Sequence, residues 1–265
     1  MNTALKSLTL GAALLAVAAP SQAQTIISQW TFDNLAVGVN ASPAPATGTG
    51  SAQTLGLSAN SPDVLADSGS STGAAGPNAW RLRGSSSVNG WTSTAAIGAQ
   101  GAEFDASTAG FSNVSLTFDL HTTTQSEANL QVEYTTDGTH WLNTSLTFAG
   151  TGASVLVNSS SALTVQGTYL QFQTPASPWY NGITANITDT AANNNASFGV
   201  RIVNASTGTD NINQSGTAYN NTSGNWRLDN VTISATPTPE PSTWALFGLG
   251  FAGLLWQIRR RRVHS

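Results

Sequence analysis

The stretch Asn-Val-Ser-Leu-Thr-Phe-Asp-Leu-His, residues 113–121, places apolar side chains at the even positions and polar side chains at the odd positions. Successive side chains of a β-strand point to opposite faces of its sheet. We therefore expect a strand whose even residues lie in a core and whose odd residues face water. This pattern returns along the chain and decides the fold class.

The same alternation continues beyond this stretch. Leu130, Val132 and Tyr134 repeat it, and residues 136–139, Thr-Asp-Gly-Thr, supply a hairpin turn before residues 141–148. No segment between the two ends of the chain has an apolar stripe at helical spacing, so the sequence predicts an all-β protein, an antiparallel β-sandwich or jelly roll. Further candidate strands are residues 25–32, 80–83, 163–172, 198–204 and 226–234.

Long polar connections separate these strands, above all residues 35–77 and 207–225. Compact domains rarely contain structureless loops of this length, so we expect short additional strands within them or real mobility. No internal repeat or central linker divides the body. It is predicted to form one β-sandwich domain, residues 24–235, flanked by an N-terminal signal peptide and a single C-terminal hydrophobic helix.

The composition favours a folded body whose surface is covered by hydroxyls and amides rather than ions. Only 8% of residues are charged, yet the chain has 8 Trp, 9 Phe and 4 Tyr, which argues against disorder. Arginines 259–262 are part of a total of 9 basic residues, so the body is acidic and we expect no nucleic-acid partner. The absence of cysteine excludes disulfides and thiolate chemistry.

Residues 1–23 have the features of a secretory signal peptide. Lys6 supplies the positive charge, and the apolar run that follows is too short to span a membrane. Ser21 and Ala23 are small residues at the −3 and −1 positions before Gln24, where signal peptidase is expected to cut. The Sec translocon and signal peptidase are therefore expected partners. The alternative, a buried N-terminal helix, leaves the small residues unexplained.

The C-terminal segment, residues 236–265, has three parts. Residues 236–242 are rich in proline and are expected to form a rigid, extended spacer. Residues 243–258 are predicted to form a transmembrane helix of about 24 Å, short of a ~30 Å hydrocarbon core, and Trp256 and the arginines can make up the difference. The positive-inside rule keeps the arginine-rich tail in the cytoplasm. This tail consists of Arg259, Arg260, Arg261 and Arg262.

This C-terminus resembles the PEP-CTERM sorting signal of Gram-negative bacteria that make exopolysaccharide. The resemblance implies recognition by an exosortase, a membrane protease that removes the tail near Pro-Glu-Pro. It also implies export, a transient stay in the inner membrane, and delivery to the cell surface or extracellular matrix. The alternative is a permanent C-terminal anchor. Besides the helix and the arginines, the matching feature is the sorting motif Pro239, Glu240, Pro241, Ser242 and Thr243.

The body resembles sandwich domains found in PEP-CTERM proteins, which are similar to carbohydrate-binding jelly rolls. The segments that carry this resemblance are residues 30–33, 132–141 and 226–231. They indicate a fold rather than a ligand.

The last predicted strand contains an electrostatic conflict. If Val231 and Ile233 point into the core, strict alternation places Arg227 and Asp229 on the same face, where an unpaired ion is costly. A bulge can rotate the pair outward, other groups can pair with it, or Asp229 can bind a hard cation. The jelly-roll resemblance implies a structural calcium, Ca2+, held by Asp33 and Asp229. No other cofactor is expected.

Catalytic chemistry is not indicated by the sequence. Asp119 and His121 share one strand face and Glu133 is expected on a neighbouring strand, so a metal or acid/base cluster is one interpretation and a wet polar face is the other. No Gly-x-Ser-x-Gly elbow, HExxH motif or phosphate loop occurs, and no carboxylate pair has a glycosidase signature. The sequence predicts a protein that is not an enzyme.

Aromatic side chains suggest a binding role. Trp179 and Tyr180 lie between a proline and an Asn-Gly pair, which predicts a loop where both rings can contact a sugar. Core packing is the ordinary alternative for a strand tryptophan. The predicted function is structural or adhesive, within exopolysaccharide or a biofilm. A carbohydrate-binding module is the alternative, followed by a polysaccharide hydrolase that uses a carboxylate such as Glu133. Further candidates for sugar contact are Trp91, Trp141 and Tyr219.

Overall fold

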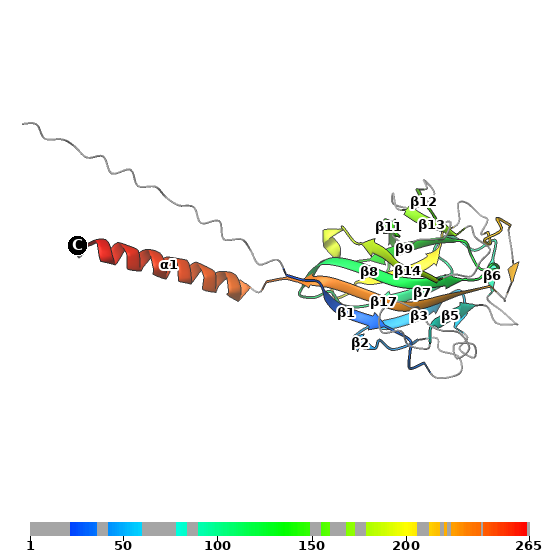
Figure 1. The fold of residues 1–265 in the computed structure, drawn as a ribbon, viewed down its shortest axis with the longest axis horizontal. Coiled ribbons are helices and arrows are strands. Elements are labelled where there is room, and N and C mark those ends of the chain that lie inside the picture. Colours follow the sequence, from blue (N-terminus) through cyan, green and yellow to red (C-terminus); the bar gives the residue numbers. More distant parts are fainter. Residues whose placement is uncertain are drawn as a thin grey trace, which may run out of the picture.

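The chain folds into two facing antiparallel β-sheets followed by a C-terminal helix (Figure 1). Most of the predicted signal peptide, with Ser21, lies outside the described residues, and so do Tyr219 and Glu240. The computed structural model describes residues 22–35, 42–59, 78–83, 90–148, 155–159, 168–172, 179–205, 212–217, 220–221, 224–239 and 241–263.

The first sheet, here called the β8 sheet, has the strand order β11-β14-β8-β17-β1-β2, with β5 added beside β17 and β4 beside β5. Its longest strands are β8 and β17, which pair antiparallel in the centre. The strands are β1 (Thr25–Trp30), β2 (Thr47–Gly48), β4 (Ser58–Ala59), β5 (Trp80–Arg83), β8 (Phe111–Thr122), β11 (Leu146–Thr147), β14 (Trp179–Asn186) and β17 (Asn225–Pro237).

The second sheet, the β9 sheet, has the order β12-β13-β9-β15-β7-β3, with β10 added beside β9. A short pair, β6 (Trp91–Thr92) with β16 (Asn220–Asn221), and a 3-10 turn, η1 (Thr190–Ala192), complete the body. The strands of the β9 sheet are β3 (Ser51–Leu55), β7 (Gly101–Asp105), β9 (Asn129–Thr135), β10 (Leu142–Asn143), β12 (Val155–Ser159), β13 (Thr168–Phe172) and β15 (Gly199–Asn204).

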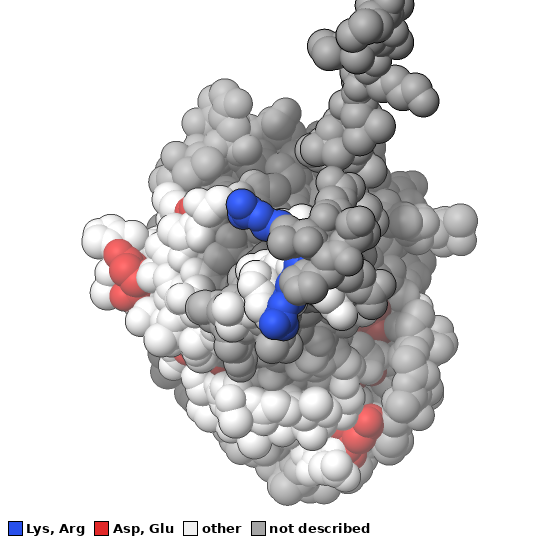
Figure 2. All heavy atoms as spheres, turned by 90° about the vertical axis from the view of Figure 1, so that its left-hand side faces the viewer, with Lys and Arg blue, Asp and Glu red and all other residues white. Residues whose placement is uncertain are grey.

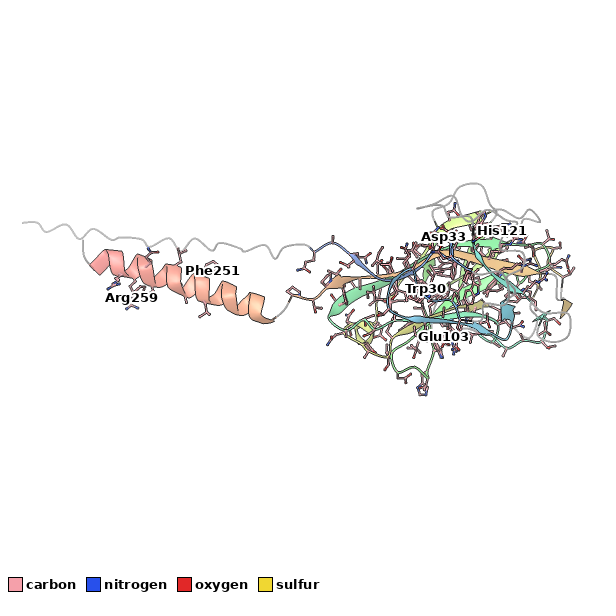
Figure 3. The ribbon with its side chains drawn as sticks, turned by 90° about the horizontal axis from the view of Figure 1, so that it is seen from below. Trp30, Asp33, Glu103, His121, Phe251 and Arg259 are labelled. Atoms are coloured by element: carbon pink, nitrogen blue, oxygen red, sulfur yellow. The ribbon has the colours of Figure 1, made fainter. Side chains whose placement is uncertain are left out.

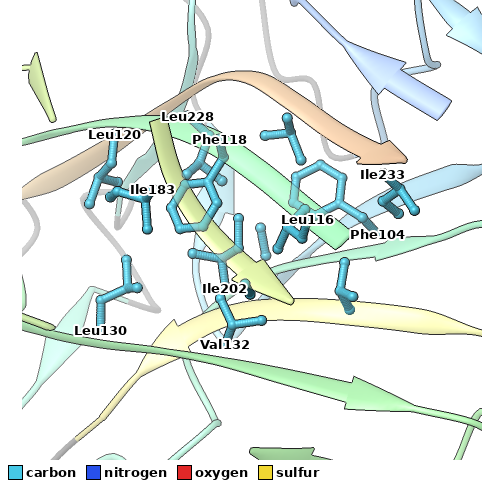
Figure 4. Packing of buried hydrophobic residues seen from close by; sticks show 14 of the residues in the cluster. Phe104, Leu116, Phe118, Leu120, Leu130, Val132, Ile183, Ile202, Leu228 and Ile233 are labelled. Carbon is cyan, nitrogen blue, oxygen red and sulfur yellow. The ribbon is translucent and has the colours of Figure 1, made fainter. Parts of the chain in front are cut away.

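The hydrophobic core lies between the two sheets. Trp30 of the β8 sheet meets Phe104 of the β9 sheet edge-on, with ring centroids 5.0 Å apart, and Trp80 meets the same ring at 5.9 Å. Leu116 and Phe118 point inward toward Ile202 and its neighbours from the opposite sheet (Figure 4). The predicted all-β class with antiparallel sheets is confirmed, whereas the jelly-roll topology stays a prediction.

The predicted strand over residues 141–148 is in fact two strands that belong to different sheets. β10 pairs with β9, and β11 pairs with β14 of the opposite sheet. Thr144 lies at the crossing: its N–H donates to the Val132 carbonyl at 3.1 Å, and its hydroxyl donates to the Asn186 carbonyl at 3.2 Å. This residue therefore bonds both sheets. The short strands β2, β3, β4 and β16 confirm the extra strands expected in the long connections.

The expectation of a water-facing outer surface on residues 113–121 holds for Asn113, which is exposed, and is wrong for Asp119 and His121. Asp119 is 2% exposed and His121 is 8% exposed, although both point away from the core. The oxygens of Asp119 accept hydrogen bonds from the Gly182 backbone N–H at 2.7 Å and the Asn230 side chain at 3.0 Å. Groups from both flanking strands thus cover this outer position. The two-residue alternation predicted the face on which each side chain lies, but not whether that face is exposed to water.

The conflict predicted in the last strand is resolved by a bulge. The pairing of β17 with β8 shifts register between Asp229 and Thr232, and Asn230 has a left-handed backbone with φ of 49°. Leu228 and Val231 are both fully buried, which strict alternation would not allow. The bulge therefore turns Asp229 away from the core, but the residue stays 2% exposed and its Oδ1 accepts the Asn230 N–H, so two of the three alternatives apply together.

The predicted proline-rich spacer, residues 236–242, is shared between a strand and a helix. β17 continues through Pro237, and α1 (Pro241–Val263) begins at the third proline. A proline is tolerated at a strand end and in the first helical position because its missing N–H is not needed there. The helix is longer than the predicted 243–258 and includes the arginines. Within the described residues, no helix joins enough length to enough apolar character for a membrane crossing.

Candidate functional site

The first candidate site is the point where the body meets the helix. The strand end, defined as residues 236–238, is held on the loop and start of β8. Thr238 donates from both its N–H and its hydroxyl to the Gly110 carbonyl, at 2.8 and 2.9 Å. Ser112 donates from its hydroxyl to the Thr236 carbonyl at 3.4 Å. The sorting motif therefore begins directly at the folded sandwich.

The helix α1 projects away from the sandwich (Figure 1). Its described apolar side chains lie on all sides of the helix rather than on one stripe. Arg260 lies over the ring of Trp256, with the guanidinium carbon 4.9 Å from the ring centroid. Seen from this end, the described surface around the helix is mostly free of Asp and Glu (Figure 2). The exposed apolar residues are Leu249, Phe251, Leu254, Leu255 and Trp256.

Two of the predicted signal-cleavage residues, Ala23 and Gln24, lie at the same end of the sandwich. Gln24 donates from its side chain to the Asn113 carbonyl at 3.3 Å, and the Ser115 hydroxyl donates to the Gln24 side-chain oxygen at 3.3 Å. Gln24 is thus part of the folded body. Ala23 is exposed. The position of the cut itself stays a prediction.

The second candidate site is a cleft of about 430 Å³ at one end of the β9 sheet. It contains three carboxylates that the sequence analysis did not single out as a group. Figure 3 places Glu103 on the opposite side of Trp30 from Asp33 and His121, so the cleft and the buried polar residues of the β8 sheet lie on different outer faces. We call it the Trp141 cleft, after the ring beside it. It is lined by Thr49, Gly50, Ser51, Glu103, Asp105, Ala106, Ser107, Asp137, Gly138, Ala196, Ser197 and Phe198.

Glu103 is fixed by its cross-strand neighbours. In the register of the sheet it lies opposite Gln53 of β3 and Arg201 of β15. One carboxylate oxygen accepts a hydrogen bond from the Gln53 amide, and the other accepts one from the Arg201 Nε, both at 2.6 Å. Charge-assisted bonds of this kind hold a carboxylate in one orientation. Glu103 therefore serves as a rigid wall of the cleft.

Trp141 connects this ion pair to Asp105. The guanidinium carbon of Arg201 lies 3.6 Å from the centroid of the Trp141 ring. Gly199 separates the ring from Asp105: a Cβ at this position would lie 3.3 Å from the Trp141 Cη2 and would collide with Asp105 Oδ1. The missing side chain at residue 199 therefore lets the half-buried indole and the carboxylate approach each other.

Two carboxylates of the cleft, Asp105 and Asp137, have pKa values that are shifted in opposite directions. Burial, and then the charge of Glu103, raise the pKa of Asp105 above its ordinary value. Hydrogen bonds from the His140 and Thr139 backbone and the His140 ring hold the pKa of Asp137 well below its usual range. Asp105 accepts a hydrogen bond from the Ser51 hydroxyl at 3.2 Å and retains lone pairs for a further donor. It is the carboxylate best placed to accept a bond from a ligand.

Glu133 belongs to the same outer face but lies under a loop. Gln131 donates to its carboxylate at 2.6 Å, and a Cβ at Gly98 would lie 2.8 Å from its Oε1. Burial raises the pKa of Glu133. The cluster suggested for Glu133 with Asp119 and His121 does not form, because β9 and β8 lie in different sheets. That interpretation is wrong.

The loop predicted for Trp179 and Tyr180 is the start of strand β14 instead. Tyr180 is fully buried, with its ring 4.5 Å from that of Phe172, so it cannot stack on a sugar. Trp179 is half-buried and its ring lies 5.5 Å from the His121 ring. The Asn-Gly pair that suggested a loop forms a bulge within β14, where Gly182 has φ of 71°. Trp179 remains a candidate, and Tyr180 does not.

The row on the outer face of the β8 sheet that contains Trp179 is strongly basic. His121 lies opposite both Trp179 and Arg227, and Arg227 lies opposite Arg81. Burial, and then the charges of Arg83 and Arg227, lower the pKa of Arg81 to about 10. Largely buried guanidinium groups on neighbouring strands are unexpected in a sequence with so few charged residues.

The calcium expected at Asp33 and Asp229 stays a prediction. The Oδ1 atom of Asp33 is buried and has no hydrogen-bond partner, which a cation would satisfy. The Oδ1 atom of Asp229 already accepts the Asn230 N–H at 2.8 Å. In the described part of the chain no group of three or more His, Cys, Asp or Glu side chains could hold a metal ion. A fall in melting temperature on chelation is the measurement that tests calcium.

The comparisons with known proteins concern the C-terminus. Residues 237–261 match the family model of the PEP-CTERM protein-sorting motif, which confirms the predicted motif. No curated protein matches the chain. The motif indicates an exported protein that an exosortase processes and that membrane-associated sorting delivers to the cell surface.

Proposed function

We propose that the mature protein is a structural or adhesive component of the cell surface or extracellular matrix, released by an exosortase cut near residues 239–241. The observation that supports this most is the match of residues 237–261 to the sorting motif, where β17 ends and α1 begins. Because both sheets are complete before the helix, the cut leaves the whole sandwich intact.

In this proposal α1 is a temporary handle in the inner membrane of a Gram-negative bacterium. Apolar side chains on all sides suit contact with lipid, and the arginines at the far end stay on the cytoplasmic side. The apolar part is short, so Trp256 and Arg260 extend it into the headgroup region. The signal peptide, residues 1–23, directs the chain through the Sec translocon and is removed before Gln24.

Mass spectrometry of the extracellular protein tests the proposal. The expected product starts at Gln24 and ends near Pro239, and it lacks peptides that contain Trp256. In a strain without its exosortase the uncut chain is expected in the membrane fraction. Recovery of Trp256 peptides from the displayed protein would show a permanent anchor instead.

A second candidate function, carbohydrate binding, is supported by the Trp141 cleft. A concave site with a few fixed polar groups and a nearby aromatic ring is typical of small-ligand recognition. Asp105 offers acceptor lone pairs to a sugar hydroxyl, and Ser51 and Ser107 add hydroxyls. Trp141 does not line the cleft itself, and its ring edge lies next to Asp105 across Gly199. This ligand class fits an adhesive role in exopolysaccharide.

Retention of the processed protein on polysaccharide gels and glycan arrays tests this candidate. We expect Trp141→Ala and Asp105→Asn each to weaken retention at least tenfold, whereas Trp179→Ala on the opposite outer face leaves it unchanged. Loss in Trp179→Ala alone would move the binding site to the β8 sheet. We propose no catalysis, so no reducing ends are expected from a polysaccharide panel. Their release, abolished in Asp105→Asn, would indicate a hydrolase.

A further inference from the structure

The sorting motif overlaps the fold of the body. The family match starts at Pro237, which is still the last residue of β17 and lies opposite Phe111 of β8. The next residue, Thr238, is held by two hydrogen bonds to the Gly110 carbonyl. The helix α1 starts at Pro241. We call the two hydrogen bonds of Thr238 to Gly110 the clamp. Positions 239 and 240 alone separate the clamp from the helix.

A protease needs a longer free segment than this. Proteolysis is concentrated in segments that are released from hydrogen-bonded structure, because the active site must surround several residues of backbone. When the local opening is fast, the rate of cutting follows the population of the open form. An exosortase that cuts near Pro239 therefore meets a substrate whose upstream residues are paired with β8.

We infer that the sandwich limits its own processing: the exosortase cuts only after the strand end, residues 236–238, has detached from the segment Gly110 to Ser112. This inference rests on the proposed exosortase cut. It assigns to the clamp the role of a built-in brake on the release of the protein from the membrane.

The buried contacts upstream of the strand end indicate how far the detachment can extend. Upstream of the strand end, Ala235 is fully buried and pairs with Thr25 of β1. Among the described residues the strand end pairs with β8 alone, and the register shifts between Ser234 and Thr236. Thr236 and Pro237 are half-buried, and Thr238 is exposed. Segments with few buried contacts open at low cost, so the last three residues can separate while the rest of β17 stays in place.

A disulfide across the strand end is the direct test. Thr236 and Ser112 are Cα partners on adjacent antiparallel strands, a spacing that a disulfide accepts, and the chain has no cysteine of its own. In the oxidised Ser112→Cys/Thr236→Cys variant we expect exosortase cutting in cells to slow at least tenfold, with uncut chain accumulating in the membrane fraction. Reduction of that fraction should restore cutting. Both substitutions lie outside the matched motif.

The matched control is a disulfide farther up the same strand pair. Ser115 and Ser234 are also Cα partners, and Ser234 precedes the fully buried Ala235. The oxidised Ser115→Cys/Ser234→Cys variant is expected to be cut at the wild-type rate. Equal rates for both oxidised variants and the wild type would overturn the inference while leaving the proposed function intact. An uncut wild-type chain would instead overturn the proposed function.

A variant with a weakened clamp tests the opposite effect, which is faster cutting. Gly110 has φ of 81° and its added Cβ would meet nothing within 4 Å, so Gly110→Ala introduces backbone strain without a clash. We expect about fivefold faster cutting, because a left-handed backbone is unfavourable for alanine. Gly216→Ala, at φ of 75° and equally open, is the control and should not change the rate. An unchanged cutting rate in Gly110→Ala would show that the Gly110 carbonyl does not limit the exosortase cut.

Discussion

The four core tryptophans of the body and Trp256 of the helix have opposite surroundings. Trp30, Trp80, Trp91 and Trp226 are at most 1% exposed, whereas Trp256 of α1 is 62% exposed. The buried indoles are also satisfied: Trp226 donates its ring N–H to the Glu127 carbonyl at 2.9 Å. The difference shows that these four indoles are part of the packed core of the sandwich, whereas Trp256 packs against none of it.

Removal of a buried ring is expected to produce the largest effect. Trp226→Ala leaves a cavity beside Trp91, whose ring lies 4.7 Å away, and leaves the Glu127 carbonyl without its donor. We expect a loss of about 3–5 kcal/mol of unfolding free energy, measured by urea titration of the processed protein. Trp256→Ala in the full chain should leave the unfolding of the sandwich unchanged. Equal losses from the two would end the contrast between body and helix.

Two substitutions in the Trp141 cleft are expected to have intermediate effects. Glu103→Gln removes the charge that holds Arg201, and we expect a loss of about 1.5–3 kcal/mol by thermal unfolding. Gly199→Ala forces Asp105 away from its present position, with an expected loss of about 1–3 kcal/mol from overpacking. Gly182→Ala, whose Cβ would meet nothing within 4 Å, measures the backbone cost alone. A cleft that tolerates both changes would be looser than the structure indicates.

The fold could be anticipated from the sequence where a strand has one clear phase. The two-residue period of residues 113–121 predicted β8, and it placed Asp229 and Val231 on one face of the last strand, for which a bulge was one of three explanations. Exposure could not be derived in this way. Asp119 and Gln131 are polar and yet buried, because neighbouring strands and the loop near Gly98 cover the outer faces.

The candidate sites differ in the same respect. The sorting motif is local in sequence, so its residues could be read directly. The Trp141 cleft is assembled from the start of β3, from β7, from the β9–β10 turn and from the loop that precedes β15, and no local pattern joins Asp105 to Trp141. One signal was available: in a body with so few charges, Arg201 in the middle of a predicted strand calls for a carboxylate partner. Glu103 is that partner.

The pH dependence of stability gives a smaller effect, which distinguishes Glu133 from Glu103 on the same outer face. Because burial raises the pKa of Glu133, the folded state holds its proton more tightly than the unfolded state. Ionised Glu133 therefore lowers stability above its folded pKa, and the cost disappears below its unfolded pKa. We expect Glu133→Gln to raise the melting temperature at pH 7 and to leave it unchanged near pH 3. A lower melting temperature at pH 7 would contradict this assignment and indicate a partner that needs the charge.

The smallest expected effect tests whether the sandwich folds independently of α1. A chain that ends at Pro239 retains both sheets and keeps Thr238 on the Gly110 carbonyl, so we expect its melting temperature to lie within about 1 °C of that of the full chain in detergent. The helix adds apolar surface, and its exposed leucines and Trp256 predict association of the full chain once detergent is removed. A drop of several degrees on truncation would mean that α1 packs against the sandwich, and the helix would then be part of the fold rather than a removable segment.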